Sequence, residues 1–255
     1  MIKFVEHSHR YLDEDDRDLI SVSAFAKKFE PFVDWNKKAA NTAKKLGVSV
    51  QEIKALWEMK RVKGSQAGTL FHNEREQELI DNEFVFNQQS LAKKCCEFKD
   101  GYKYSIPITN IENNTVYPEL MIYNLEHRIC GQSDKVIVQD NKIHVYDYKT
   151  DKSIDFKGYS DKWTAPLHLL PPVDHLESCN GNMYTLKMSL YMYMLWKANK
   201  GRFKPGDIIL EWCPLDRDED GVPILTDGKP HSSRTEVIKL PYLKKEVEAM
   251  LNYKK

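Results

Sequence analysis

The sequence predicts a mixed α/β fold, in which a central β-sheet is flanked by helices and preceded by a helical N-terminal part. Three observations predict this fold. Helical patterns occupy residues 21–81, short β-rich runs separated by turn signals occupy residues 102–148, and a helix, a strand and a helix follow from residue 182 onward. We expect a single domain, with residues 1–66 forming a helical cap and residues 67–255 forming the core.

Length and composition are those of a soluble globular protein. The chain has 255 residues and a formal net charge of zero, which is enough chain for a sizeable core. It lacks a run of ~20 apolar residues and an N-terminal apolar signal core, so we expect a cytoplasmic protein with no membrane partner. Zero net charge weakens the general case for nucleic-acid binding but leaves room for local basic patches that grip phosphate.

The five cysteines are Cys95, Cys96, Cys130, Cys179 and Cys213. An odd and scattered set argues against a disulfide framework, and the absence of a CxxC pair argues against a zinc ribbon. We expect buried free thiols.

The first elements are short. Residues 2–12 alternate weakly and predict a strand or hairpin arm. A short helix follows, with Ser21 or Ser23 as its N-cap. The next helical pattern, residues 34–46, is closed by Gly47.

A capping box at Ser49 and Glu52 predicts the start of the next helix, which continues with apolar residues at helical spacing. The stretch Lys63-Gly-Ser-Gln66 is expected to end it. A further helix is expected from Ala67 to about Asp81.

The clearest β-unit is a hairpin within residues 134–149, whose two strands flank a turn at Gln139-Asp140-Asn141. Alternation places Asp147 and Lys149 on one face of the second strand. Asp134 begins the first strand, so the hairpin brings Asp134 and Asp147 to the same open end.

The C-terminal part alternates between loops and regular elements. Residues 151–180 contain three prolines and predict a long functional or mobile loop. An apolar helix over residues 182–200 is followed by a strand at 209–215, a polar exposed turn region at 216–234 and an amphipathic helix over residues 240–255.

Asp147 and Lys149 allow two interpretations. They could form a salt bridge at a strand end, or they could belong to a catalytic site. Asp134 adds a second carboxylate at the same place, and Glu119 could supply a third from a neighbouring strand. Converging carboxylates repel unless a cation lies between them, and hard oxygen ligands favour Mg²⁺ or Mn²⁺.

The order Glu119, Gly131-Gln-Ser-Asp134 and Asp147-Tyr-Lys149 resembles the PD-(D/E)xK nuclease superfamily. The closer similarity is to its RecB-like exonuclease branch, which includes phage-encoded and mitochondrial genome maintenance exonucleases. Gly68-Thr-Leu-Phe-His72 resembles the upstream GxxxH motif of that branch. Lys187-Met-Ser-Leu-Tyr191 stands where its downstream QxxxY motif would be.

The resemblance implies a restriction-endonuclease-like core and a role for each motif residue. His72, Asp134, Asp147 and the backbone carbonyl of Tyr148 would hold Mg²⁺ or Mn²⁺. Glu119 would support the ion or its waters, and Lys149 would position the attacking water and help it lose a proton. Glu76, one helical turn after His72, could orient the imidazole or be a plain surface acid.

The last motif departs from the family pattern, because Lys187 replaces a glutamine. Lys187 could contact a DNA phosphate while Tyr191 stacks or hydrogen-bonds. Alternatively, Lys187 could extend from an apolar helix over a core tyrosine. Trp163 and His168 could form a DNA-stacking arch or a packed loop.

The expected function is that of a Mg²⁺- or Mn²⁺-dependent DNA exonuclease acting on single strands or DNA ends, in the host cytoplasm if the chain is phage-encoded. The cysteine spacing predicts no iron–sulfur cluster. Three alternatives remain open: a nuclease-fold DNA-binding or assembly protein that does not cleave, a structure-specific endonuclease, and an α/β interaction domain whose acids and lysines form ordinary salt bridges. Protein partners are not predicted.

Overall fold

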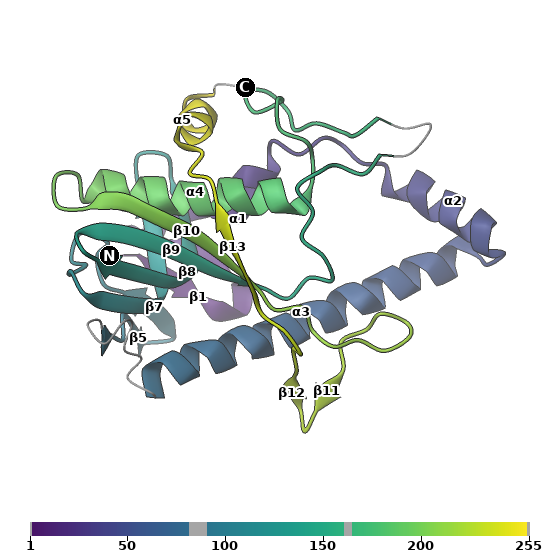
Figure 1. Cartoon of the computed structure of the whole chain (residues 1–255), viewed down its shortest axis with the longest axis horizontal. Helices are drawn as coiled ribbons and strands as arrows, with labels where there is room; N and C mark the ends of the chain where they lie inside the picture. Colours follow the sequence, from purple (N-terminus) through teal and green to yellow (C-terminus); the bar gives the residue numbers. More distant parts are fainter. Residues whose placement is uncertain (1, 82–90, 161–164, 254–255) are drawn as a thin grey trace.

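The computed structural model describes residues 2–81, 91–160 and 165–253. A large mixed β-sheet forms the centre of the molecule, and helices lie on both of its faces (Figure 1). The α/β class predicted from the order of patterns is confirmed.

The helices and strands follow in chain order. The helices are η1 (Glu6–Ser8, 3-10), α1 (Val22–Lys27), α2 (Trp35–Leu46), α3 (Val50–Asp81), α4 (Asn180–Ala198) and α5 (Lys244–Asn252). The strands are β1 (Lys3–Val5), β2 (Arg10–Leu12), β3 (Asp18–Ser21), β4 (Leu91–Ala92), β5 (Cys96–Lys99), β6 (Tyr102–Ser105), β7 (Thr115–Asn124), β8 (Ile129–Gln139), β9 (Lys142–Lys149), β10 (Lys204–Trp212), β11 (Leu225–Thr226), β12 (Lys229–Pro230) and β13 (Glu236–Leu240).

Strand β8 lies inside the sheet and pairs with other strands along both of its edges. Strand β7 runs antiparallel along one edge. The other edge is shared: β9 pairs antiparallel with the C-terminal half of β8, and β3 pairs parallel with its first two residues. Beyond β9, the sheet continues through the parallel strand β10 and the antiparallel strand β13.

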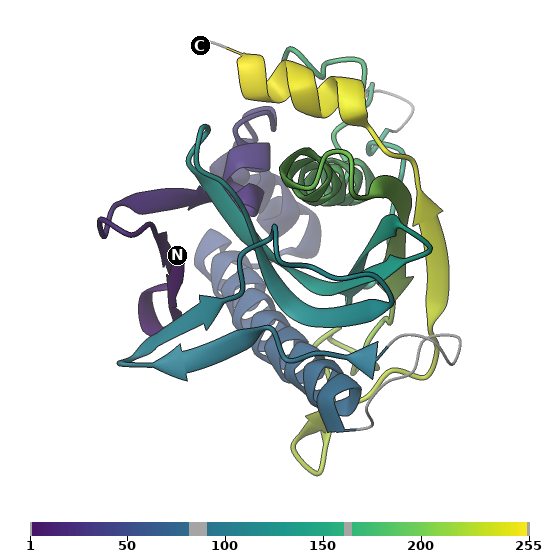
Figure 2. The same ribbon diagram turned by 90° about the vertical axis from the view of Figure 1, so that its left-hand side faces the viewer.

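Two layers of helix cover this sheet. Helices α1, α4 and α5 lie on one face, and the long helix α3 crosses the other (Figures 1 and 2). The main core lies on the α4 side, where side chains of α4 such as Leu186 and Leu190 pack on Val136 and Val145 of the sheet. Ala67 and Phe71 of α3 pack on Tyr148 from the opposite side.

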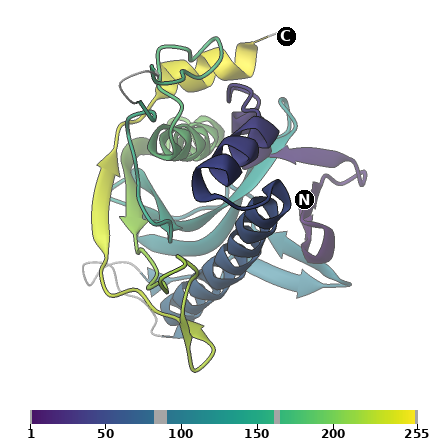
Figure 3. The same cartoon turned by 90° about the vertical axis from the view of Figure 1, so that its right-hand side faces the viewer.

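Helix α2 packs against the first turns of α3 at one end of the molecule (Figure 3). Its end is fixed by Gly47, whose φ of +71° is the left-handed conformation that glycine tolerates. The predicted capping box is confirmed, because Ser49 Oγ accepts from the Glu52 backbone N–H at 3.2 Å and Glu52 Oε2 accepts from that of Ser49 at 2.7 Å. Ser21, one of two expected caps, accepts from Ala24 N–H and begins α1.

The predicted break near Lys63-Gly64 is wrong, because α3 runs without interruption from Val50 to Asp81. The expected boundary between residues 66 and 67 therefore falls inside one helix. A glycine weakens a helix by about 1 kcal/mol relative to alanine but keeps its backbone N–H, so it does not end the helix as proline does.

The expected helical cap over residues 1–66 is also only partly correct. The expected hairpin arm is present as β1 and β2, but with β3 it joins the central sheet through β8. The pairing of β3 with β8 joins residues far apart in the sequence, and the local pattern of a strand does not specify its partner.

The central hairpin has the predicted strands, with a shorter turn than expected. Gln139 pairs with Lys142, so the turn contains only Asp140 and Asn141. Both have positive φ, 50° and 57°, as a two-residue type I′ turn requires. This register fixes which residues of β8 and β9 face each other at the open end.

Candidate metal centre

Three acidic residues stand in one row across three adjacent strands. The residues on either side of Glu119 pair with those on either side of Asp134, so the two acids occupy opposite positions on β7 and β8. The next pairing, Lys135 with Tyr146, puts Asp134 opposite Asp147 of β9 in the same way. The row lies where the ladder between β8 and β9 ends.

The sheet is split at this row. Residues 131–134 of β8 have no partner on the β9 edge among the strands that the structure describes, because β9 pairs only from Lys135 onward and β3 only up to Cys130. Asp134 closes the ladder instead, since its Oδ2 accepts a hydrogen bond from the Tyr148 backbone N–H at 2.5 Å. The split lets side chains from both helix layers approach the strand ends.

Glu119 has an uncommon backbone conformation for a strand residue. Its φ is +50°, a left-handed geometry that costs a non-glycine residue roughly 1–2 kcal/mol. Alternation along β7 changes phase there, so that Tyr117 and Leu120 both reach the core beneath α4 while Met121 packs in a second cluster. Strain of this kind concentrates at functional sites.

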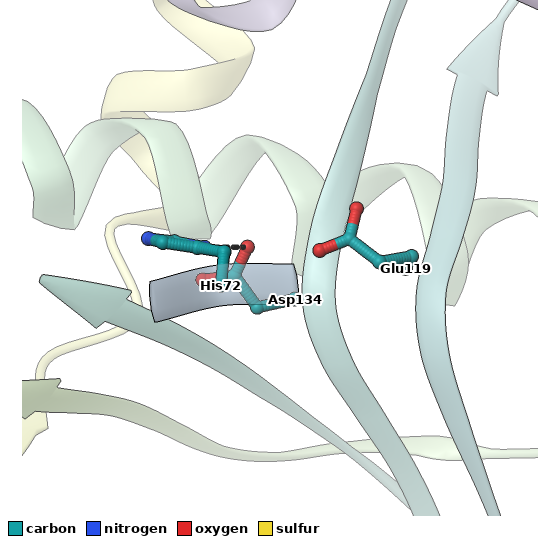
Figure 4. Close-up of side chains that lie close together, drawn as sticks. All are labelled: His72, Glu119 and Asp134. Atoms are coloured by element: carbon teal, nitrogen blue, oxygen red, sulfur yellow. Dashed lines mark ion pairs between the residues drawn. The ribbon is translucent and has the colours of Figure 1, made fainter. Parts of the chain in front are cut away.

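His72, Glu119 and Asp134 form a cluster with the donor set of a metal site (Figure 4). One ligand atom of each residue lies within 4.8 Å of the others, and His72 Nδ1 is 3.1 Å from Asp134 Oδ1. Ligands of one Mg²⁺ at about 2.1 Å lie about 3 to 4.2 Å apart. Small side-chain movements would therefore let the three residues hold one ion.

Electrostatics in the cluster also favour a cation. Burial and the neighbouring Asp134 carboxylate raise the pKa of Glu119 to about 8. Lys103 of β6 opposes this rise, but its Nζ is also 4.0 Å from Glu76. The expected contact between Glu76 and the His72 imidazole is not formed in the part of the chain that the structure describes.

Asp147 is placed differently from the expected metal ligand. Its side chain is 1% exposed and forms ion pairs with Lys149 and, at 3.2 Å, with Lys187. Burial alone would raise the pKa of Asp147, but the two ammonium groups hold it well below its ordinary value. The structure therefore groups His72, Glu119 and Asp134 around one point and leaves Asp147 between two lysines.

The remaining predicted residues lie beside the cluster. The carbonyl oxygen of Tyr148 accepts a hydrogen bond from Lys149 Nζ at 2.9 Å. Tyr191 is 2% exposed, and Lys187 Nζ lies 5.6 Å from the centre of its ring. Tyr191 is thus a largely buried side chain beneath a lysine, and it forms part of the cleft wall together with Lys187.

A cleft of about 1030 Å³ opens over the cluster. Its walls come from α3, α4, the split in β8 and the loop after β10. Basic side chains line it at several points: Lys60, Arg61, Lys103, Lys149, Lys187 and Arg217. The lining also contains the acids Glu6, Glu76, Glu119, Asp134 and Asp151, so the basic groups offer separate contacts for phosphates and do not form a uniformly positive surface.

Lys103 and Arg217 are residues of the cleft that the sequence did not single out. Arg217 lies in a stretch expected to be a solvated turn, yet its guanidinium donates to the carbonyl oxygens of Thr150 and Gly221. Its Nε is buried and has no hydrogen-bond partner among the described residues. Neither residue belongs to a recognisable motif, because both reach the cleft through long-range packing.

In the described part of the loop over residues 151–180, His168 and Glu177 form a β-bridge. His168 does not line the cleft, and Trp163 lies outside the described residues.

All five cysteines are free thiols, with Cys95, Cys130 and Cys213 buried. None of the helices in residues 2–81, 91–160 and 165–253 combines the length and apolar character that a bilayer crossing requires.

Comparison with protein-family models, with curated proteins and with solved structures found no match. Function is therefore inferred from the motifs and the geometry of the site.

Proposed function

We propose that the protein is a metal-dependent DNA nuclease with a restriction-endonuclease-like core, which hydrolyses phosphodiester bonds using Mg²⁺ or Mn²⁺. One observation carries the proposal. Two carboxylates and an imidazole converge within 4.8 Å in a cleft that is also lined by Lys149 and Lys187. This is a cation site beside basic groups that can accept a polyanion.

His72, Glu119 and Asp134 are the residues that would hold the ion. Two carboxylates match the oxygen preference of Mg²⁺, and one imidazole is tolerated well by Mn²⁺. Such an ion, when bound, would lower the pKa of a water molecule and stabilise negative charge on the phosphate.

The lysines supply the rest of the chemistry. Lys149 Nζ stands between the Asp147 carboxylate and the Tyr148 carbonyl, which holds the ammonium group at the edge of the cluster. From there it can orient a water molecule against a bound phosphate. Lys187, Arg61 and Arg217 would contact the flanking phosphates from different walls of the cleft.

A second candidate is a DNA-binding protein with a nuclease fold and no cleavage. The placement of Asp147 favours it, because this carboxylate is paired with two lysines and is absent from the residues that line the cleft. In the nuclease proposal, Asp147 holds Lys149 and Lys187 in place beside the cluster instead of binding the ion itself.

End-labelled DNA separates these candidates. Single-stranded, duplex and closed circular DNA would be incubated with Mg²⁺, Mn²⁺ or a chelator, alongside Asp134→Asn as the inactive control. Cleavage that needs the metal and Asp134 supports a nuclease, and restriction to linear DNA supports an exonuclease acting on ends or single strands. Binding without cleavage under every condition would favour the second candidate, and equal cutting of circles would indicate an endonuclease.

A further inference from the structure

A second cavity, of about 660 Å³, lies next to the proposed active cleft and has a different character. Its walls come from α1, the start of α2, the loop over residues 151–180 and the start of α4. Most of the lining is apolar: Ala26, Pro31, Val33, Trp35, Leu167 and Met183 contribute to it together with Tyr159 and Tyr184. We refer to this cavity as the side chamber.

The side chamber adjoins the cleft. Lys187 lines both cavities, and it is the lysine whose Nζ lies 3.2 Å from Asp147. Tyr184 is part of the chamber wall, and Lys149 Nζ lies over its ring, 5.0 Å from the ring centre. The chamber therefore shares a wall with the part of the cleft that holds Lys187.

Aromatic groups at the chamber are unusually open to solvent. Trp35 is 64% exposed and Tyr159 is 77% exposed, although both side chains are large and largely apolar. The Trp35 ring packs against Trp57 in a T-shaped pair, with 6.1 Å between the ring centres. Fixed aromatic surface beside a binding cleft is a feature of sites that stack planar ligands.

The charged residues at the chamber favour a planar ligand that also carries negative charge. Among the residues that the structure describes, its lining includes Lys27, Lys38 and Lys187 and a single acid, Glu30. A ligand that brings negative charge to the rim and a flat apolar group to the interior complements this arrangement. An unpaired nucleotide has this chemistry, whereas the bases of a duplex are stacked inside the double helix and cannot enter.

We propose that the side chamber binds one or two unpaired bases of a DNA strand whose neighbouring phosphate lies at the metal cluster. This inference rests on the proposed function, and it names the substrate as single-stranded DNA or a frayed end. Lys187 would then mark the point where the backbone passes from the cleft and the bases turn into the chamber.

The test is a binding measurement that needs neither metal nor cleavage. Fluorescence anisotropy, in the presence of a chelator, would compare three labelled probes: oligothymidine, an abasic backbone of equal length and charge, and a blunt duplex. Stacking of a single base predicts that the parent protein prefers oligothymidine to the abasic strand by roughly 5- to 150-fold. The blunt duplex should bind no better than the abasic strand.

Two variants and one control locate the effect. Tyr159→Ala, alone and combined with Trp35→Ala, should lose most of the preference for oligothymidine while affinity for the abasic strand stays within about twofold. Tyr159→Ala is informative even if removal of Trp35 loosens α2. Phe32→Ala is the matched control, since Phe32 is 89% exposed on the same segment as Trp35 but lines neither cavity.

The outcomes are separable from those of the nuclease test. Equal affinity of the parent for oligothymidine and the abasic strand would overturn the chamber proposal even if DNA is cleaved. So would a preference that survives both variants, or one that Phe32→Ala removes equally. A preference that depends on Tyr159 in a protein that cleaves nothing would support the chamber and overturn only the nuclease proposal.

Discussion

Asp134 and Tyr148 are joined across the split in the sheet by a hydrogen bond of 2.5 Å from the Tyr148 backbone N–H to Asp134 Oδ2. The other carboxylate oxygen, Oδ1, lies 3.1 Å from His72 Nδ1. One side chain thus ends the β8–β9 ladder and also belongs to the metal cluster. The two contributions can be separated by substitution.

Asp134→Asn should abolish metal uptake with little loss of stability, because the amide oxygen can still accept from the Tyr148 N–H. Asp134→Ala should also abolish metal uptake, and it should lower the free energy of unfolding by ~1–3 kcal/mol by leaving that buried N–H without a partner. Urea denaturation and calorimetric titration with Mn²⁺ measure the two effects. An equal loss of stability in both variants would show that the hydrogen bond is not what stabilises the strand end.

Glu119 should make the metal-free protein less stable as the pH rises. Its pKa of about 8 in the folded state is above the ordinary value of 4.5, so between these values the folded chain holds a proton that the unfolded chain releases. The free energy of unfolding should therefore fall over this window, by at most ~1.4 kcal/mol per pH unit. Urea denaturation in a chelator at about pH 5 and about pH 8 tests this.

Glu119→Gln is the matched variant for this pH dependence. It keeps the shape of the side chain but cannot ionise, so the part of the slope that is due to Glu119 should vanish. The stabilisation relative to the parent should be larger at high pH than at low pH. An unchanged slope would mean that other groups cause it.

The same protonation predicts how metal binding responds to pH. Mn²⁺ should displace the proton on Glu119, so affinity should increase as the pH rises toward 8 and proton release should be detectable in buffers of different ionisation enthalpy. In Glu119→Gln, both the proton release and most of the affinity should be lost. Release of the same number of protons from this variant would place the titrating group elsewhere.

The local parts of the fold could be read from the sequence. The cap at Ser21, the end of α2 at Gly47 and the central hairpin depend on neighbouring residues, and all three are present. The row of Glu119, Asp134 and Asp147 was only partly predictable. The hairpin places Asp134 and Asp147 together by alternation, but the position of Glu119 depends on the register of β7 and on its positive φ.

What the sequence did not specify depends on non-local packing. The joining of β3 to β8 and the convergence of Lys103 and Arg217 on the cleft involve residues far apart in the chain. The pairing of Asp147 with two lysines was half predicted, since Lys149 shares its strand face whereas Lys187 comes from α4. The sequence of a helix and the sequence of a strand do not, by themselves, indicate that the helix will pack against the end of that strand.

The Asp147 ion pairs should be strongly interdependent. Lys187→Met leaves Lys149 to balance the buried carboxylate, so the loss of stability should be modest. Removing both lysines by Lys149→Met and Lys187→Met should cost ~3–5 kcal/mol, because a buried charge remains without a partner. Adding Asp147→Asn should recover most of this loss.

A cycle of these variants, measured by urea denaturation, gives the coupling energy directly. Simple additivity of the two lysine substitutions, with no recovery from Asp147→Asn, would show that the carboxylate is hydrated or neutral rather than held by the two ammonium groups.

Gly131 should be required for the packing of α4 over the split in β8. A Cβ at this position would lie 2.6 Å from Tyr191 Oη and 2.9 Å from Tyr191 Cε1, and Tyr191 is too buried to move aside. Gly131→Ala should therefore destabilise the protein by ~1–3 kcal/mol. Tyr191→Phe removes the hydroxyl but leaves the ring, so the double variant should recover only part of the loss.

Gly64→Ala is the matched control for Gly131→Ala, because a Cβ at Gly64 meets nothing within 4 Å and Gly64 lies inside α3. This change should stabilise the protein by about 1 kcal/mol through helix propensity alone. The four variants to compare are Gly131→Ala, Tyr191→Phe, their combination and Gly64→Ala. In thermal and urea denaturation, the two glycine-to-alanine changes should alter the free energy of unfolding in opposite directions. A Gly131→Ala protein as stable as its parent would mean that α4 does not press Tyr191 onto β8, and that Lys187 is not held above the split by this contact.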